Sequence, residues 1–172
     1  MKTLPQLTAY FAISVLMMAS ACHSPISSPE PKAPLLPGLG DHQLEITTDS
    51  KMAKKYFSQG FSLTYGFNHD EAERSYREAV RQDSTCAMCY WGVAQVLGSN
   101  YNVAMPEEVK QEAARMINRA QQYAPGTTAW EQGLISATAM RYNYGKTDDQ
   151  PTLDADYAEA LRQLHQQFPE HI

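Results

Sequence analysis

Several features that usually reveal a function are missing from this sequence. Its 14 lysines and arginines are outnumbered by 19 aspartates and glutamates, giving a formal charge of −5, and they form no basic block. Because nucleic-acid binding needs clustered positive charge, we expect no nucleic-acid partner. The sequence also has no glycine-rich phosphate loop, no nucleophile–base pair and no two carboxylates at a recognisable catalytic spacing. We therefore expect no enzyme, no cofactor and no catalytic residue.

Long apolar runs are equally scarce. The one run that matters, Leu7–Ala21, has no charged residue over 15 positions and follows a basic Lys2. It is shorter than the roughly 18–20 residues of a membrane-spanning helix and has the length of the apolar core of a signal peptide. The sequence therefore predicts an export signal over residues 1–21 and excludes a polytopic membrane protein.

Cysteine is rare, with three residues in all, and the first of them directly follows the apolar run. The small residues Ala19, Ser20 and Ala21 before this cysteine resemble the lipobox of bacterial lipoproteins. The resemblance implies a lipoprotein-type signal peptide and a lipidated Cys22 at the mature N-terminus. It also implies a location in the cell envelope, on the periplasmic or surface side of a bacterial membrane. The alternative is plain cleavage after Ala21, which gives a secreted protein with a free Cys22 thiol.

The segment after Cys22 is rich in proline, with five prolines between His23 and Gly40. Proline has no backbone N–H and keeps a chain extended, so this composition is typical of a spacer. We expect residues 22–49 to form a disordered, proline-rich tether and lead-in segment. Such a tether would hold a folded domain away from the membrane to which Cys22 is anchored.

Helical patterns begin near Ser50 and continue towards the C-terminus. Runs of β-branched residues are few, and breaks fall at clusters of glycine, proline and asparagine. Two pairs match the capping-box spacing, Asn68 with Glu71 and Thr128 with Glu131. We therefore predict an all-α fold. The predicted helices span residues 50–66, 70–82, 86–98, 106–123, 128–142 and 154–167.

The predicted helices come in pairs that repeat at about 34 residues, the period of tetratricopeptide repeats. Small residues recur at matching positions, where two helices of a pair need them to approach closely. In the first pair, Gly60 is predicted to face Ala72 and Ala79, and in the second pair Ala94 takes the place of this glycine. The first pair carries Gly60, Ala72, Tyr76 and Ala79. The second carries Ala94, Ala113, Ile117, Ala120 and Pro125, with seven inserted residues around Gly98–Glu107. The third carries Tyr157, Leu161, Leu164 and Pro169.

Six stretches carry a more specific signal: Tyr56–Gly60, Gly66–Ala72, Cys86–Gly92, Gly98–Asn102, Leu39–His42 and Ile46–Thr48. Together they resemble a family of bacterial exported tetratricopeptide-repeat (TPR) proteins. The resemblance covers Leu39 to the C-terminus and implies a TPR-like α-α superhelix of two to three repeats over residues 50–172. Members of the family are usually much longer, so we expect the helical repeat domain to be truncated at its C-terminus.

The two remaining cysteines, Cys86 and Cys89, form a C-x-x-C pair. Tyr90 stands where a c-type haem attachment needs histidine, which excludes that chemistry. Three alternatives stay open: a disulfide, which an exported location permits, two packed thiols, or metal or redox chemistry. His69, in a predicted turn, is the nearest further ligand, and it is otherwise a turn histidine bonded to neighbouring backbone. A small metal- or redox-active exported protein using His69, Cys86 and Cys89 is thus the alternative function.

The TPR resemblance also implies a binding surface, because one face of the first helix in each repeat lines the concave side. Aromatic and apolar side chains on such a face are typical of anchors for a partner. The alternative is that Leu39–Thr48 or the inserted Tyr101–Val103 folds over this face and covers it. We expect a non-catalytic interaction scaffold, a membrane-tethered TPR lipoprotein that binds a protein or peptide. The predicted partner-binding residues are Lys54, Phe57, Phe61, Tyr65, Met88, Trp91 and Gln95.

Overall fold

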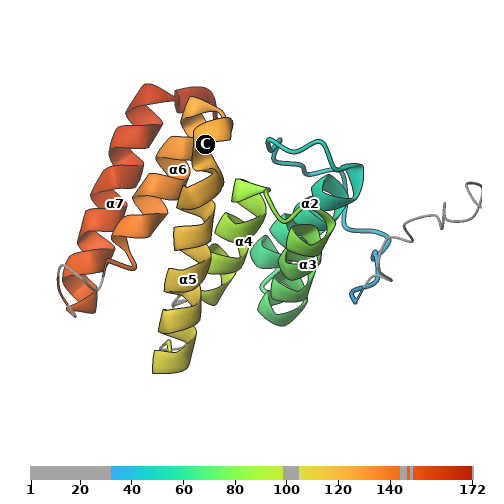
Figure 1. Ribbon diagram of the computed structural model, residues 1–172, viewed down its shortest axis with the longest axis horizontal. Coiled ribbons are helices and arrows are strands. Elements are labelled where there is room, and N and C mark those ends of the chain that lie inside the picture. The colour runs from blue at the N-terminus through green and yellow to red at the C-terminus, as the bar shows by residue number, and fades with distance from the viewer. Residues whose placement is uncertain (1–31, 99–104, 144–146, 148, 172) are drawn as a thin grey trace, which may run out of the picture. The chain divides into compact units, whose positions relative to one another are not determined.

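The computed structural model describes residues 32–98, 105–143, 147 and 149–171 (Figure 1). The predicted signal peptide, Cys22 and the first part of the tether lie outside these residues. The described residues contain helices and no strands, so the all-α prediction is confirmed. None of these helices combines the length and the apolar character needed to cross a membrane. The helices are α2 (Lys51–Tyr65), α3 (His69–Gln82), α4 (Ala87–Leu97), α5 (Glu107–Tyr123), α6 (Ala129–Met140) and α7 (Gln150–Gln167), with 3-10 turns η2 (Ala124–Gly126) and η3 (Pro169–His171).

Five of the six predicted helices agree with the structure to within two residues at each end. The exception is α7, which begins at Gln150, four residues earlier than predicted. The Asp149 side chain caps this end by accepting a hydrogen bond from the Thr152 amide at 3.2 Å. Pro151 is tolerated in the first turn, because an N–H at that position has no partner within the helix.

One of the two predicted capping boxes forms. Thr128 Oγ1 accepts a hydrogen bond from the Glu131 amide at 3.2 Å, and Glu131 Oε2 accepts one from the Thr128 amide at 2.9 Å. The prediction for Asn68 is wrong, because its side chain makes no capping hydrogen bond. Glu71, its expected partner, pairs with Arg74 at 2.6 Å instead.

Consecutive helices pack as three hairpins, α2–α3, α4–α5 and α6–α7. Successive hairpins are in contact, because α3 also packs on α4 and α5 on α6 (Figure 1). The first helices of the hairpins touch as well: α2 contacts α4, and α4 contacts α6. One continuous apolar core therefore runs through all three hairpins.

A single aromatic ring determines how closely the first helices pack. Tyr76 of α3 is fully buried, and its ring lies against the backbone of two glycines from different hairpins. A Cβ atom added to Gly60 of α2 would lie 2.8 Å from this ring, and one added to Gly92 of α4 would lie 2.4 Å from it. Gly60 was predicted to face Ala72 and Ala79, but a Cβ built there meets the Tyr76 ring, so the partner differs from the prediction. In the third hairpin, Gly133 admits Leu164 in the same way, with 2.3 Å between a built Cβ and the leucine Cδ1.

Residues 32–49, which we call the strap, are folded onto the helices. The prediction of a disordered tether is therefore wrong for this part of residues 22–49. Ala33 and Ile46 are buried in the core cluster, and strap atoms bond to side chains of α2, α3 and α6. The physical reason is that buried polar side chains on these helices need partners, and the main chain of the strap supplies them.

Candidate functional site

Three of the seven predicted partner-binding residues cannot contact a partner. Phe57 and Met88 are 0% exposed and Trp91 is 6% exposed. The Phe57 ring lies 6.4 Å from the Trp91 ring, and Trp91 Nε1 donates a hydrogen bond to Thr138 Oγ1 at 2.8 Å. The prediction is wrong for these residues because all three are buried in the core, where Phe57 and Trp91 make contacts between neighbouring first helices.

Two predicted residues form an accessible aromatic pair. Phe61 and Tyr65 lie one turn apart on α2, with ring centroids 4.9 Å apart in an edge-to-face arrangement. Tyr65 is 72% exposed, whereas Phe61 is half-buried. Together with Ser62 and two strap residues, Leu39 and His42, they line a mostly apolar cleft of about 380 Å³. We call this the aromatic cleft. The strap thus forms one wall of it and leaves Tyr65 open.

The two other predicted residues have intramolecular contacts. Lys54 is exposed and lies 4.0 Å from the strap carboxylate of Glu45. Gln95 Oε1 accepts a hydrogen bond from the Tyr157 hydroxyl at 3.4 Å, which joins α4 to α7. Burial raises the pKa of this tyrosine above its ordinary value, and the Arg141 guanidinium lies 5.5 Å from its ring centroid. Gln95 therefore contributes to the packing of α7 on α4. Its side chain is half-buried, so part of it remains accessible.

The cysteine pair forms a disulfide in the structure. The Cys86 and Cys89 sulfurs are bonded at 2.06 Å, and both residues are buried at the start of α4. Of the three alternatives left open by the sequence, the structure has the disulfide. The Cys86 sulfur also accepts a hydrogen bond from the Cys89 amide at 3.1 Å, which caps the helix.

The structure does not assemble His69 with the cysteines. His69 begins α3 and Cys86 follows its end, and a helix of this length is about 20 Å long. The His69 ring instead stacks on Phe67, with centroids 6.4 Å apart. Within the described ranges, no three His, Cys, Asp or Glu side chains are grouped as metal ligands. Among the described residues, the structure therefore does not bring the three proposed residues His69, Cys86 and Cys89 together.

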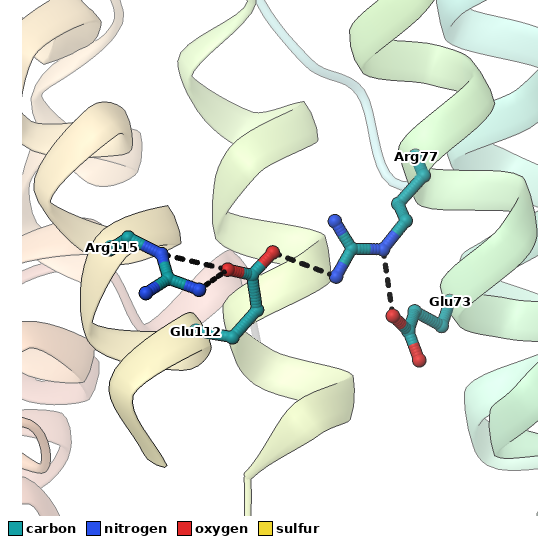
Figure 2. Close-up of polar contacts among 4 residues, drawn as sticks. All are labelled: Glu73, Arg77, Glu112 and Arg115. Atoms are coloured by element: carbon teal, nitrogen blue, oxygen red, sulfur yellow. Dashed lines mark hydrogen bonds and ion pairs between the residues drawn. The ribbon is translucent and has the colours of Figure 1, made fainter. Parts of the chain in front are cut away.

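Second helices of neighbouring hairpins are joined by a charged network, which the sequence analysis did not identify (Figure 2). Arg77 of α3 binds Glu73 at 2.7 Å and reaches across to Glu112 of α5 at 2.9 Å. Glu112 also pairs with Arg115 on its own helix at 2.5 Å. Burial alone would raise the pKa of Glu112, but hydrogen bonds from the two arginines outweigh it, so the pKa lies below its ordinary value. Each of these charges is paired within the network, so the network serves packing.

Two buried carboxylates hold the ends of the strap, and neither was predicted to bind it. Glu131 accepts hydrogen bonds from the Thr47 amide at 2.7 Å and from the Thr47 hydroxyl at 2.5 Å. Glu78 accepts one from the Lys32 amide at 3.0 Å. The Thr128–Glu131 capping spacing was a signal for the first carboxylate, but it did not indicate a second partner in the strap.

Comparisons with known proteins return nothing: no family model matches the chain, and no curated protein and no solved structure matches it. The resemblance to exported TPR proteins therefore stays a hypothesis.

Proposed function

We propose that residues 50–172 form a TPR-like α-α superhelix of two to three repeats. The order of contacts supports this proposal, because each helix packs on the next one and the first helices of successive hairpins also touch. A repeat stack has this nearest-neighbour pattern, whereas a closed bundle brings its first and last helices together. The glycines that admit Tyr76 and Leu164 add the small-residue positions that such hairpins need.

We further propose that the protein is a non-catalytic scaffold that binds a protein or peptide through the aromatic cleft. The carrying observation is the Phe61–Tyr65 pair, because Tyr65 is 72% exposed among the described residues and exposed aromatic pairs are typical of binding anchors. The apolar cleft beside it offers a place for a partner side chain. Lys54 of α2 and Gln95 of α4 are both accessible in part, and neither of them lines this cleft.

The scaffold is proposed to be tethered to a bacterial membrane by a lipidated Cys22, or to be secreted if that residue is not lipidated. The small residues before Cys22 and the apolar run of residues 7–21 support export. The buried disulfide between Cys86 and Cys89 fits the same location, because disulfides persist in oxidising compartments.

Site-specific photocrosslinking tests this function. A benzophenone amino acid at Tyr65 of the full-length protein, expressed in its native envelope, is expected to crosslink to a discrete partner protein. The matched control places the same group at Phe67, which is 86% exposed on the α2–α3 turn and lies outside the cleft. Phe61→Ala should lower the Tyr65 crosslink about tenfold, as expected for loss of an anchor.

Equal crosslinking from both positions, or no effect of Phe61→Ala, would contradict a binding role for the aromatic cleft. Mass spectrometry of the same purified protein determines the mature N-terminus. An acylated Cys22 supports the membrane anchor, and a free Cys22 thiol after cleavage at Ala21 supports secretion.

A further inference from the structure

The first part of the strap is held through its main chain. Gln59 of α2 makes two hydrogen bonds with it: Nε2 donates to the Pro34 carbonyl at 3.0 Å, and Oε1 accepts from the Leu36 amide at 2.7 Å. The Gln59 side chain is nearly buried, and Nε2 also donates to Ser75 Oγ of α3 at 2.9 Å. This third contact fixes the orientation of the amide, so Gln59 is prepositioned to bind an extended backbone.

Two further side chains extend the same pattern along the chain. The Tyr56 hydroxyl donates to the Ala33 carbonyl at 3.0 Å, and Glu78 Oε2 accepts from the Lys32 amide at 3.0 Å. Arg74 donates to the Lys32 carbonyl at 3.3 Å. Every one of these contacts is to a backbone atom of the strap. Any polypeptide in the same extended conformation could supply the same donors and acceptors.

The side chains of residues 32–36 contribute little to this binding. Only Ala33 is buried, at 3% exposed, whereas Leu35 and Leu36 are 43% and 37% exposed. The groove therefore selects for a small side chain at one position and accepts many at the others. Pro34 holds the preceding residue extended, so a small residue followed by proline matches the groove with little loss of conformational freedom.

We propose that the groove between α2 and α3 is a binding site for an extended peptide of another polypeptide, carrying a small residue followed by proline. The strap is then the resident occupant, which competes with the incoming peptide for Gln59, Tyr56 and Glu78. The groove is distinct from the aromatic cleft, because none of these three side chains lines that cleft. The proposal therefore does not depend on the proposed function.

A labelled peptide tests this site directly. The probe is an acetylated, fluorescent peptide with the sequence of residues 32–38, and its binding is measured by fluorescence anisotropy. Ala33→Arg in the full-length protein should expel the strap, because the buried position has no room for the longer, charged side chain. The variant is expected to bind the probe at least about tenfold more tightly than the unchanged protein, in which a tethered segment competes at a high effective concentration.

Two changes distinguish main-chain recognition from apolar adhesion. In the Ala33→Arg background, Gln59→Leu should weaken probe binding about tenfold, because both hydrogen bonds of the amide are lost. In the probe, N-methylation at Leu36 should cause a similar loss, since it removes the amide hydrogen that Gln59 accepts. A probe with serine in place of Leu35 should bind like the parent, because that side chain is largely exposed.

Circular dichroism first establishes that the Ala33→Arg protein is folded. If the Ala33→Arg protein is not folded, the anisotropy measurement is replaced by NMR of the isotope-labelled unchanged protein with excess unlabelled probe. Binding of the probe should then move the amide resonances of Lys32 and Leu36 towards the chemical shifts of a disordered chain. Absence of binding in the measurement used, or equal binding by the Gln59→Leu variant, overturns the proposal. Pairing of the Ala33→Arg protein with an unchanged copy, without probe binding, also overturns it, because the groove would then accept only a second copy of the strap.

Discussion

Tyr76 shows how one residue joins two hairpins. Its ring lies between Gly60 of α2 and Gly92 of α4, and it also lies 5.4 Å from the Phe57 ring. Burial raises the pKa of its hydroxyl well above the ordinary value. The Tyr76 side chain is therefore neutral, and its ring fits between the two helices only because Gly60 and Gly92 have no Cβ atom.

Replacing Gly92 with alanine is expected to destabilise the protein by up to about 2 kcal/mol. Alanine favours a helix over glycine by about 1 kcal/mol, but the new methyl group would lie 2.4 Å from the Tyr76 ring. Overpacking of this kind costs about 1–3 kcal/mol and outweighs the gain in helix propensity. Urea unfolding followed by circular dichroism measures the change.

Gly126→Ala is the matched control, because a Cβ at Gly126 would meet nothing within 4 Å. Its free energy of unfolding should stay within about 0.5 kcal/mol of the unchanged protein. A Gly92→Ala protein as stable as this control would contradict the prediction, because the cost of moving the Tyr76 ring would then not exceed the gain in helix propensity.

The sequence predicted a close approach of helices at Gly60, but it predicted neither Tyr76 as the partner nor the role of Gly92. The repeat pattern pointed to Ala94 as the second small residue, because it lies 34 positions after Gly60. Ala94 is buried and accepts a hydrogen bond from the Tyr142 hydroxyl at 2.7 Å, so its carbonyl is used by the third hairpin. A contact between repeats depends on how helices turn relative to each other, which a period along the chain does not specify.

At the scale of elements, helices could be predicted from sequence because each carries its own period and end signals. The strap could not, because its partners Gln59, Glu78 and Glu131 are polar residues that a sequence pattern assigns to the surface. Folding buries these side chains, and their need for hydrogen bonds then holds the strap. The prediction that Phe57 and Trp91 bind a partner was wrong for a different reason. The sequence pattern identified an apolar helix face, but it could not show that another helix of the same chain covers this face.

Replacing Glu131 with alanine is expected to loosen α6 and the strap together, at a cost of about 2–4 kcal/mol. The buried carboxylate accepts hydrogen bonds from both Thr47 and Thr128, and the substitution leaves these donors without that partner. Urea unfolding gives the stability, and amide exchange at Thr47 reports release of the strap.

Glu131→Gln is the control with nearly the same shape. It keeps one amide oxygen as an acceptor, so the loss should be about half as large. Equal stability of the alanine and glutamine variants would contradict this expectation, because the acceptor oxygen that glutamine keeps would then contribute nothing.

At the scale of the whole molecule, contacts between hairpins make separate unfolding of one hairpin costly. Trp91 bonds to Thr138, Gln95 bonds to Tyr157, and α3 is joined to α5 by its charged network. The described helices should therefore unfold together in one transition.

The stability of this unit is expected to fall in acid. Burial alone would raise the pKa of Asp83, but hydrogen bonds from Thr48 and Thr85 and from the Thr85 and Cys86 amides outweigh it, and the pKa lies below its ordinary value of 3.8. The pKa of Glu112 likewise lies below its ordinary value of 4.5. A carboxylate with a depressed pKa contributes stability that is fully present above its unfolded-state pKa and lost as the pH falls through the folded-state pKa. The free energy of unfolding should therefore hold from pH 7 to about pH 5 and decrease below it.

Arg77→Met provides the comparison for this profile. Because the Arg77 and Glu112 side chains are 41% and 23% exposed, solvent screening limits the expected loss at pH 7 to about 1 kcal/mol or less. The difference in the free energy of unfolding between the Arg77→Met variant and the unchanged protein should become smaller towards pH 3 and at high salt. A difference that is constant across pH would show that Arg77 acts through its packing alone.

The packing of the Tyr76 ring of α3 between α2 and α4 limits how this chain can be divided for transfer to another protein. A fragment containing only α2 and α3 would lose the contact between Tyr76 and Gly92 of α4, and one face of the tyrosine ring would be exposed to water. A transplanted piece that contains α2 and α3 must therefore also contain α4.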